Sequence, residues 1–331
     1  MLTSLVQPSF ELPGTLSDGF QISGKLTTPS QGGTYRLSDL DLRAGTNNIA
    51  GWLELAPFEA PLELRASLTS TSLDLRSLIS GPNEQPAPMD QSPAPTSDRL
   101  FSPEPLDLGW LETLKLDLQL NVAELKLPRL GIENLEAQVK IADGGLKLKP
   151  LRAAVGGGES TGELALNAGE APRLSGEVLV KDLDLAQMLK MLDLPDTIRG
   201  KTGLKLKLEG RGESPSQLAA SLEGRFSLAM QDGQIASRYL KMAELYGLEL
   251  TNAFLKLFKV GSKQKSEFVQ IECLVVRFEI SDGIAQSNAL VFDTERAGVV
   301  GKGEIDLKSE QLNITLEPVS PGGSASPGWP S

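Results

Sequence analysis

The sequence predicts a mainly β protein, in which a long curved antiparallel sheet forms a groove or half-barrel accompanied by a few short amphipathic helices. Three observations support this fold class. Apolar and polar residues alternate with a period of two along many segments, as in strands with one buried and one solvated face. Asp-Gly pairs, which accept the positive φ angles of tight turns, separate several of these segments. Similar β units also recur, and units that cannot bury an apolar face alone stack on one another.

The stretch Ile271–Pro318 shows this pattern most completely. Apolar and polar residues alternate on both sides of Asp282-Gly283, so two strands joined by a tight turn are predicted. Further turns are expected near Thr294–Gly298 and at Lys308–Gln311, where they separate two more strands. The stretch is therefore predicted to form an antiparallel meander.

A second regular segment lies in the middle of the chain. Its apolar residues occupy alternate positions and are predicted to share one strand face; they are Leu114, Leu116, Leu118, Leu120 and Val122. The Asp-Gly pairs Asp18-Gly19, Asp143-Gly144 and Asp232-Gly233 are interpreted as turns. The pentapeptide Gly162–Leu166 returns in similar form as Gly303–Leu307, which indicates repeated β units.

Three segments are predicted to be helical. Leu185–Leu192 places apolar residues at helical spacing, with Asp184 as N-cap and Pro195 beyond its end. A turn or two of helix is expected between Ser214 and Ala220. Gln234–Lys259 is predicted to form two amphipathic helices separated by a kink.

Composition shifts divide the chain into four regions. Residues 1–79 are predicted to be an N-terminal β-repeat region, and residues 106–318 a longer β-groove region. Between them, residues 80–105 contain seven prolines among polar residues, which predicts a disordered linker. Residues 319–331 are rich in Pro, Gly and Ser and are expected to be a disordered tail.

Charge and residue usage exclude several function classes. With 32 Lys and Arg against 43 Asp and Glu, the formal net charge is -11, so a surface for nucleic-acid phosphates is not expected. The chain has no histidine, which removes the usual base of serine and cysteine nucleophiles and the usual imidazole ligands of zinc. We predict no catalytic residues, no cofactor and no metal site. The single cysteine, Cys273, is interpreted as a packed strand residue.

Two other patterns are interpreted structurally. The carboxylates of Asp39 with Asp41, and of Asp182 with Asp184, could act as acid and base, but residues two apart on a strand share the solvated face. The glycine-rich stretches Gly156–Gly162 and Gly298–Gly303 lack the complete pattern of a phosphate-binding loop. Both are predicted to lie at turns or bulges.

A family resemblance is carried by four segments of the C-terminal stretch, namely Ser281–Ala285, Leu290–Thr294, Gly301–Leu307 and Leu312–Pro318. They resemble the conserved end of the AsmA family, and the order of upstream elements from Trp110 is similar to that family as well. The resemblance implies a curved sheet with an apolar groove, similar to bridge-like lipid transfer proteins. It also implies a non-enzymatic role in outer-membrane biogenesis and phospholipid transport in Gram-negative bacteria.

The resemblance implies a location too. AsmA-like proteins are held in the inner membrane by an N-terminal helix, with the remainder in the periplasm. This chain contains no apolar run of the length that spans a bilayer and no signal-peptide pattern at its start. We therefore expect a periplasmic protein whose inner-membrane anchor lies upstream of this chain, with phospholipid, membrane and envelope proteins as partners.

The apolar face of the sheet is predicted to be a lipid groove, because the predicted helices are too few to cover it. Aromatic residues make up 5% of the chain, so the lining is rich in leucine and suits flexible acyl chains. The residues predicted to line the groove are Leu114, Leu116, Leu118, Leu120, Leu204, Leu206 and Leu208. A sheet that closes into a dry core is the alternative.

A membrane-contacting helix is the second candidate site. Arg238, Lys241, Phe254 and Phe258 would touch phospholipid head groups and the membrane interface. The competing and favoured interpretation is a solvated helix face that caps a sheet end. As an alternative function, a structural or assembly factor would pair its sheet with envelope proteins. A carbohydrate-binding module is disfavoured because the aromatic residues are few and scattered.

Overall fold

The computed structural model describes residues 19–27, 33–76, 99–237, 268–295 and 298–319. These residues form two compact units. Unit 1 comprises the described parts of Met1–Asp98, Pro105–Val155 and Ser160–Ser175, and unit 2 comprises Arg99–Glu104, Gly156–Glu159 and the described parts of Gly176–Ser331. Each unit is described by itself below.

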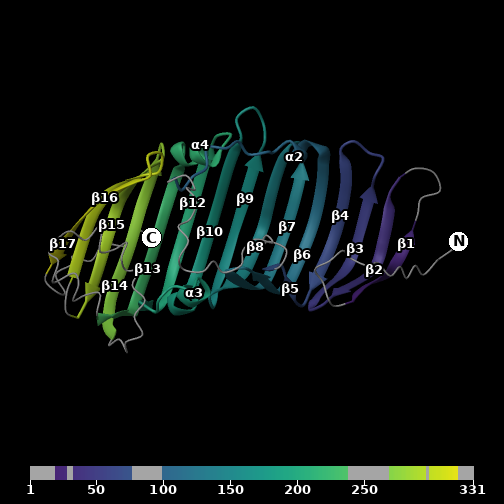
Figure 1. Cartoon of the computed structure of the whole chain (residues 1–331). Coiled ribbons are helices and arrows are strands. Elements are labelled where there is room, and N and C mark those ends of the chain that lie inside the picture. The colour runs from purple at the N-terminus through teal and green to yellow at the C-terminus, as the bar shows by residue number, and fades with distance from the viewer. Residues whose placement is uncertain (1–18, 28–32, 77–98, 238–267, 296–297, 320–331) are drawn as a thin grey trace, which may run out of the picture. The chain divides into compact units, whose positions relative to one another are not determined.

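Seventeen described strands belong to one sheet, with three short described helices (Figure 1). Unit 1 holds β1 (Phe20–Thr27), β2 (Tyr35–Ala44), β3 (Asn47–Ala56), β4 (Leu62–Ser70), β5 (Leu73–Asp74), β6 (Leu114–Leu127), β7 (Leu130–Ala142), β8 (Gly145–Val155) and most of β9 (Gly158–Asn167), with the helix α2 (Trp110–Thr113). Unit 2 holds most of β10 (Arg173–Asp184), then β11 (Ile198–Arg199), β12 (Lys201–Arg211), β13 (Glu223–Ala236), β14 (Phe268–Ser281), β15 (Ile284–Thr294), β16 (Gly298–Asp306) and β17 (Gln311–Val319), with α3 (Leu185–Met191) and α4 (Pro215–Ala220). The prediction of a mainly β protein with one long open sheet and few short helices is confirmed.

Hairpin pairing accounts for most of the sheet. The β14–β15 pair turns at Asp282-Gly283, where both residues have positive φ angles of 48° and 75°. The β7–β8 pair turns at Asp143-Gly144 with φ angles of 52° and 69°. Both turns were predicted from their Asp-Gly pairs. The third predicted pair of this type, Asp18-Gly19, begins outside the described residues.

One pair of strands departs from the antiparallel arrangement. Strands β4 and β6 run parallel over nine residue pairs, from Leu62 opposite Leu114 to Ser70 opposite Val122. Parallel neighbours need a long connection that carries the chain back to the same end of the sheet. The chain between β5 and β6, which contains the Pro-rich stretch, provides that length.

The Asp232-Gly233 turn prediction is wrong. Strand β13 continues through both residues, because Gln231 pairs with Cys273 and Gly233 with Ile271 in an unbroken register with β14. On the other side of β13, the pairs Arg199–Gln234 and Thr202–Met230 leave two residues of β11 and β12 opposite three of β13. Asp232 has a φ of 56°, so the pair forms a bulge that bends the strand. Asp-Gly therefore marks a positive φ angle, which a bulge uses as readily as a turn.

Two of the three predicted helical segments are confirmed. In α3, the Asp184 carboxylate accepts hydrogen bonds from the backbone N–H groups of Ala186 at 2.9 Å and Gln187 at 3.1 Å, as an N-cap does. Helix α4 is capped in the same way by Ser214. The helix predicted from Gln234 does not begin there, because β13 extends to Ala236, and the rest of that prediction lies outside the described residues. Helix α2 was not predicted.

The predicted linker and tail are covered only in part. Residues 77–98 and 320–331 lie outside the described residues, so disorder there stays a prediction. Residues 99–104 at the end of the predicted linker make hydrogen bonds within unit 2. The four predicted regions differ in their bounds from the two compact units, and as domain boundaries they stay a prediction.

Gly51 illustrates a requirement for glycine inside a strand. It has a φ of 144°, and a Cβ atom there would lie 2.0 Å from the carbonyl oxygen of Ser67 on β4. Strands β3 and β4 therefore approach at a point where only glycine fits.

We predict that Gly51→Ala lowers the free energy of unfolding by roughly 1–3 kcal/mol, because the new methyl group clashes with backbone and the φ angle is strained. Gly169→Ala is the control, since a Cβ atom there has no neighbour within 4 Å. Urea unfolding followed by circular dichroism measures both variants. Equal stability of the two would contradict the proposed close approach.

Candidate functional site

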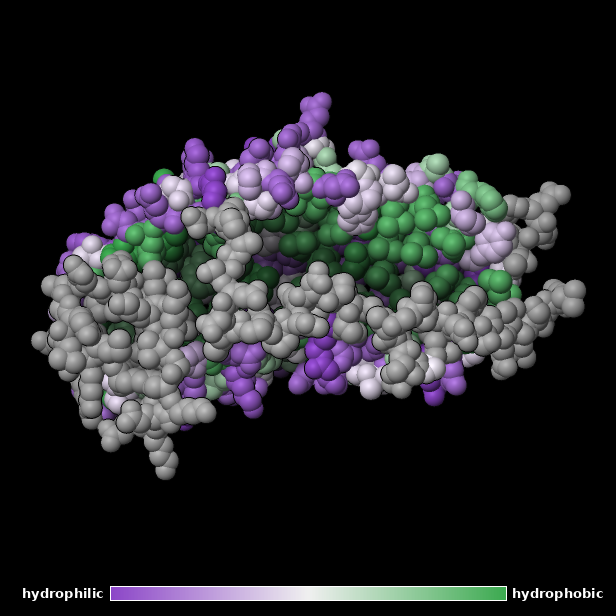
Figure 2. Space-filling view, in the orientation of Figure 1, coloured by the Kyte–Doolittle hydropathy of each residue, from purple (hydrophilic) through white to green (hydrophobic). Residues whose placement is uncertain are grey.

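One face of unit 1 is a continuous aliphatic surface. Cross-strand neighbours fall into rows that run perpendicular to the strands, and side chains in such a row contact one another. One row contains Leu55, Leu64, Leu116, Ile141 and Leu146, and the next contains Leu37, Leu53, Ala66, Leu118, Val139 and Leu148. We call this surface the unit 1 apolar face. Figure 2 shows hydrophobic residues gathered over β3, β4, β6 and β7, with hydrophilic residues at the upper strand ends.

The side chains in the middle of this face are partly exposed to solvent. Leu53, Leu116, Leu118 and Leu148 are all half-buried. Among the described residues, strands β3 to β8 pack against neighbouring strands and α2, and no second sheet lies against them. Among the described residues, the side chains of this face are thus shielded from water only by one another, as expected for an apolar sheet surface without a second layer.

The opposite face of unit 1 is charged. Ion pairs link neighbouring strands there, with Arg36 Nη1 at 2.6 Å from Glu54 Oε1, and Lys115 Nζ at 3.0 Å from Glu63 Oε1. Trp52 also lies on this face, with the Arg36 guanidinium 5.0 Å from its ring centroid. Exposed ion pairs of this kind contribute little to stability. Their charges make this face hydrophilic, whereas the opposite face is aliphatic.

Unit 2 has an apolar face of its own. Leu204 on β12 lies opposite Leu228, which lies opposite Val276, which in turn lies opposite Leu290. The row ends with Gly301 and Leu316 on β16 and β17. We call this the unit 2 apolar face. In unit 2 the other face is less uniformly charged, because one of its rows also contains small apolar residues, namely Ala229, Val275, Val291 and Val300.

The most buried side chains lie beside the short helices and at some positions within the strands, such as Val122 and Met230, each 2% exposed. Leu111 of α2 is fully buried, and α2 packs against β6, β7 and β8. In unit 2, α4 buries Leu218 and Ala219, and α3 buries Leu189. Each described helix is too short to cover a face and packs near the ends of the strands.

The predicted groove residues lie where alternation placed them. Leu114, Leu116, Leu118 and Leu120 share one face of β6 in unit 1, and all are half-buried. Leu204, Leu206 and Leu208 share one face of β12 in unit 2 and are half-buried as well. The structure therefore divides the predicted set between two units. It adds neighbours such as Leu53, Leu64 and Val139, which the alternation in their own segments could have identified.

The second predicted site is not described. Arg238, Lys241, Phe254 and Phe258 lie outside the described residues, so the membrane-contacting helix stays a prediction.

The groups with catalytic potential have structural partners. Asp184 caps α3, Asp41 accepts two hydrogen bonds from Arg43, and Asp39 lies 3.0 Å from Lys25 Nζ. Burial, and then the neighbouring Asp293 carboxylate, raise the pKa of the Cys273 thiol above its ordinary value, which keeps the thiol protonated. No cluster of three or more acidic or cysteine side chains that could hold a metal ion occurs within the described part of the chain.

Comparison with known proteins decides the family. The model of the AsmA family matches residues 21–290. The chain belongs to the AsmA family. That match starts further upstream than the sequence resemblance noted above and covers strands of both units. An AsmA family protein, YhjG of Escherichia coli strain K12, is 26% identical over 194 residues, which is 58% of this chain and 27% of YhjG.

The AsmA chain described here thus spans about a quarter of the length of the curated relative that it matches. No solved structure matches it. Among the residues that the structure describes, no helix is long and apolar enough to cross a membrane.

Because the leucines of the unit 1 apolar face are half-buried, their replacement should lower stability less than replacement of a core leucine does. We predict that Leu118→Ala lowers the free energy of unfolding by about 1 kcal/mol, whereas Leu111→Ala lowers it by roughly 2–5 kcal/mol. The same atoms are removed in both variants, but only Leu111 leaves an internal cavity. Urea unfolding measures the difference, and an equally large loss for Leu118→Ala would show that the face is a closed core.

Proposed function

We propose that this AsmA family protein binds phospholipid acyl chains on its apolar sheet faces and serves outer-membrane biogenesis without enzymatic chemistry. The observation that carries the proposal is the unit 1 apolar face: aligned aliphatic rows, mostly half-buried, with no second layer against them among the described residues. Membership of the AsmA family supports an envelope role.

The dimensions of the face suit an acyl chain. A row that crosses six strands at a spacing of about 4.8 Å extends roughly 24 Å. The hydrocarbon core of one bilayer leaflet is roughly 15 Å thick, so a row is long enough to cover a phospholipid tail. Aliphatic side chains offer no polar partner that would hold one orientation, and binding then depends on the apolar area removed from water.

Replacement of Leu118 by Asp tests the proposal. We expect Leu118→Asp to weaken binding of a fluorescent phospholipid by about tenfold or more, because a carboxylate in the middle of the row must lose its water when the acyl chain binds. Gln119→Asp is the matched control, since Gln119 is the next residue of β6 and is exposed on the charged face.

Circular dichroism must show that both variants are folded. The proposal fails if wild type binds no phospholipid, or if Gln119→Asp weakens binding as much as Leu118→Asp does. Unfolding of Leu118→Asp alone would identify the face as a core.

We further propose that the full-length protein is anchored in the inner membrane upstream of this chain, with these residues in the periplasm. Family membership supports this location. Protease added to cells with a permeabilised outer membrane should digest these residues while the inner membrane stays intact. Complete protection, or a full-length gene product with no hydrophobic segment upstream, would contradict the proposed location.

A role as an assembly factor is the second candidate. Phe58 in the β3–β4 turn is 75% exposed beside Tyr35, and Trp110 in α2 is 47% exposed. Exposed aromatic side chains of this kind anchor protein interfaces. If this is the function, Phe58→Ala should impair outer-membrane assembly in cells while phospholipid binding by the purified protein is unchanged.

A further inference from the structure

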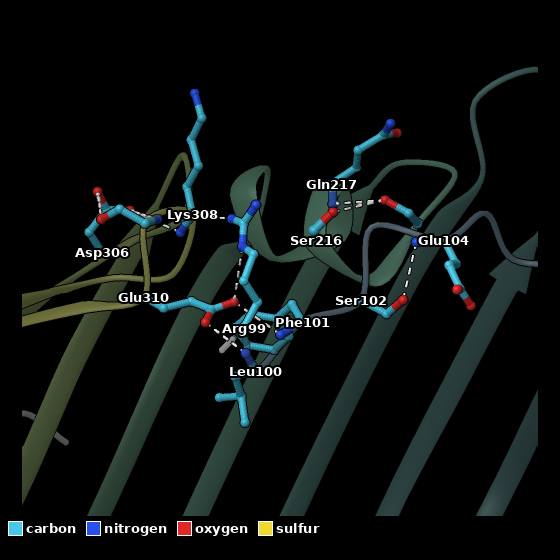
Figure 3. A network of polar contacts seen from close by, with 12 residues as sticks. Arg99, Leu100, Phe101, Ser102, Glu104, Ser216, Gln217, Asp306, Lys308 and Glu310 are labelled. Atoms are coloured by element: carbon cyan, nitrogen blue, oxygen red, sulfur yellow. Dashed lines mark hydrogen bonds and ion pairs between the residues drawn. The ribbon is translucent and has the colours of Figure 1, made fainter. Parts of the chain in front are cut away.

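A short segment of unit 2 is tied across one end of its strands. Residues 99–104, which we call the strap, make contact at two places (Figure 3). At one place the backbone N–H groups of Leu100 and Phe101 donate to the two carboxylate oxygens of Glu310, at 2.7 and 3.0 Å. At the other, the backbone N–H of Ser216 in α4 donates to the carbonyl oxygen of Ser102 at 3.0 Å.

The contact at Glu310 is the stronger of the two. Its side chain is 16% exposed, and Arg99 Nε lies 3.8 Å from Oε1. The backbone N–H groups of Phe101 and Leu100, and then the Arg99 charge, hold the pKa of Glu310 below its usual value. The carboxylate is therefore ionised near neutral pH, and hydrogen bonds to an ionised acceptor are stronger than those between neutral groups.

The turn that carries Glu310 is built without the strap. Asp306 accepts hydrogen bonds from the backbone N–H groups of Lys308 at 2.9 Å and Ser309 at 3.1 Å, and from the Ser309 hydroxyl at 2.7 Å. This arrangement fixes the β16–β17 turn locally. The strap adds one further bond to it, from Arg99 Nη2 to the Lys308 carbonyl oxygen at 2.8 Å. Glu310 therefore stays in place whether the strap is bound or released.

The strap lies at the end of the unit 2 apolar face. Between its two contacts is the β14–β15 turn, where Gly283 N donates to Leu222 O at 3.0 Å and Leu307 N donates to Gly283 O at 2.9 Å. Ile280 and Ala285, which lie next to this turn on the apolar face, are only 7% and 5% exposed. The middle of the same face is half-buried, so this end is more closed than the middle.

The Leu100 side chain lies on the surface of the strap. It is 81% exposed although its backbone is held by Glu310. In Figure 3 the Leu100 side chain points away from α4 and the β16–β17 turn, along the direction of the strands. The strap is therefore held through the backbone of Leu100 and not through its side chain.

We propose that the strap is a releasable stop at this end of the unit 2 apolar face, and that Glu310 is the positioning residue that holds it closed. The proposal rests on the proposed binding of acyl chains. The strap is held by one side chain and single hydrogen bonds instead of a strand ladder, so it can open without unfolding any strand. When open, it uncovers the strand ends past which an acyl chain can enter or leave.

The test uses the whole 331-residue chain and two readouts. Hydrogen exchange of the Leu100 and Phe101 amides reports opening of the strap, and stopped-flow uptake of a fatty acid with an environment-sensitive fluorophore reports access. We expect Glu310→Gln to speed both by about tenfold, because the amide cannot replace the two charge-assisted bonds. Arg99→Ala should give a smaller increase in both.

Glu304→Gln is the matched control, since Glu304 is exposed on the adjacent strand β16 and its replacement removes the same charge. It should leave both rates unchanged. The gain in uptake should disappear when Leu206 is also replaced by Asp, because Leu206 lies on the unit 2 apolar face.

The two proposals fail in different ways. Unchanged exchange in Glu310→Gln would show that Glu310 does not hold the strap. Faster exchange with unchanged uptake would show that the strap does not limit access, although acyl-chain binding would stand. If wild type takes up no fatty acid, the proposed function fails and the stop fails with it.

Discussion

Side chains alternate between the two faces of a strand, and the register of neighbouring strands aligns residues of the same kind. This constraint organises the protein. In unit 1, Leu64, Leu116 and Ile141 are side by side because β4, β6 and β7 pair with matching alternation. A shift of any strand by one residue would exchange its aliphatic and charged faces. The apolar face therefore exists only because every strand keeps the same phase.

An aliphatic sheet face normally needs a second layer to remove it from water. Here the described helices are 4, 7 and 6 residues long, and they bury leucines at strand ends instead of covering a face. Stability then depends on backbone hydrogen bonds along the sheet and on the side chains that are buried beside the helices and within the strands. The half-buried leucines of each face carry a smaller share of that stability, which is consistent with the proposed binding of acyl chains.

Polar contacts have a different distribution. Exposed ion pairs on the face opposite the unit 2 apolar face, such as Arg225 with Glu279 and Lys302 with Glu317, connect neighbouring strands. Each adds little to the free energy of folding. The carboxylates that accept backbone hydrogen bonds are found at strand and helix ends, where Asp184, Asp306 and Glu310 satisfy N–H groups that no ladder reaches. Specific polar interactions thus determine how the ends are closed, and aliphatic rows determine the faces.

Local signals in the sequence determined much of this protein. Alternation placed Leu114 to Leu120 on one face of β6, and Asp-Gly pairs located the turns at residues 143 and 282, because both signals act between residues close in the chain. Tertiary structure alone decided the rest. Asp232-Gly233 became a bulge within β13 because β13 has one more residue there than the neighbouring β11 and β12, and β6 joined β4 in parallel because of a long connection. The strap was closed by Glu310, more than two hundred residues away in the chain, and no periodicity in the sequence records a contact between such distant segments.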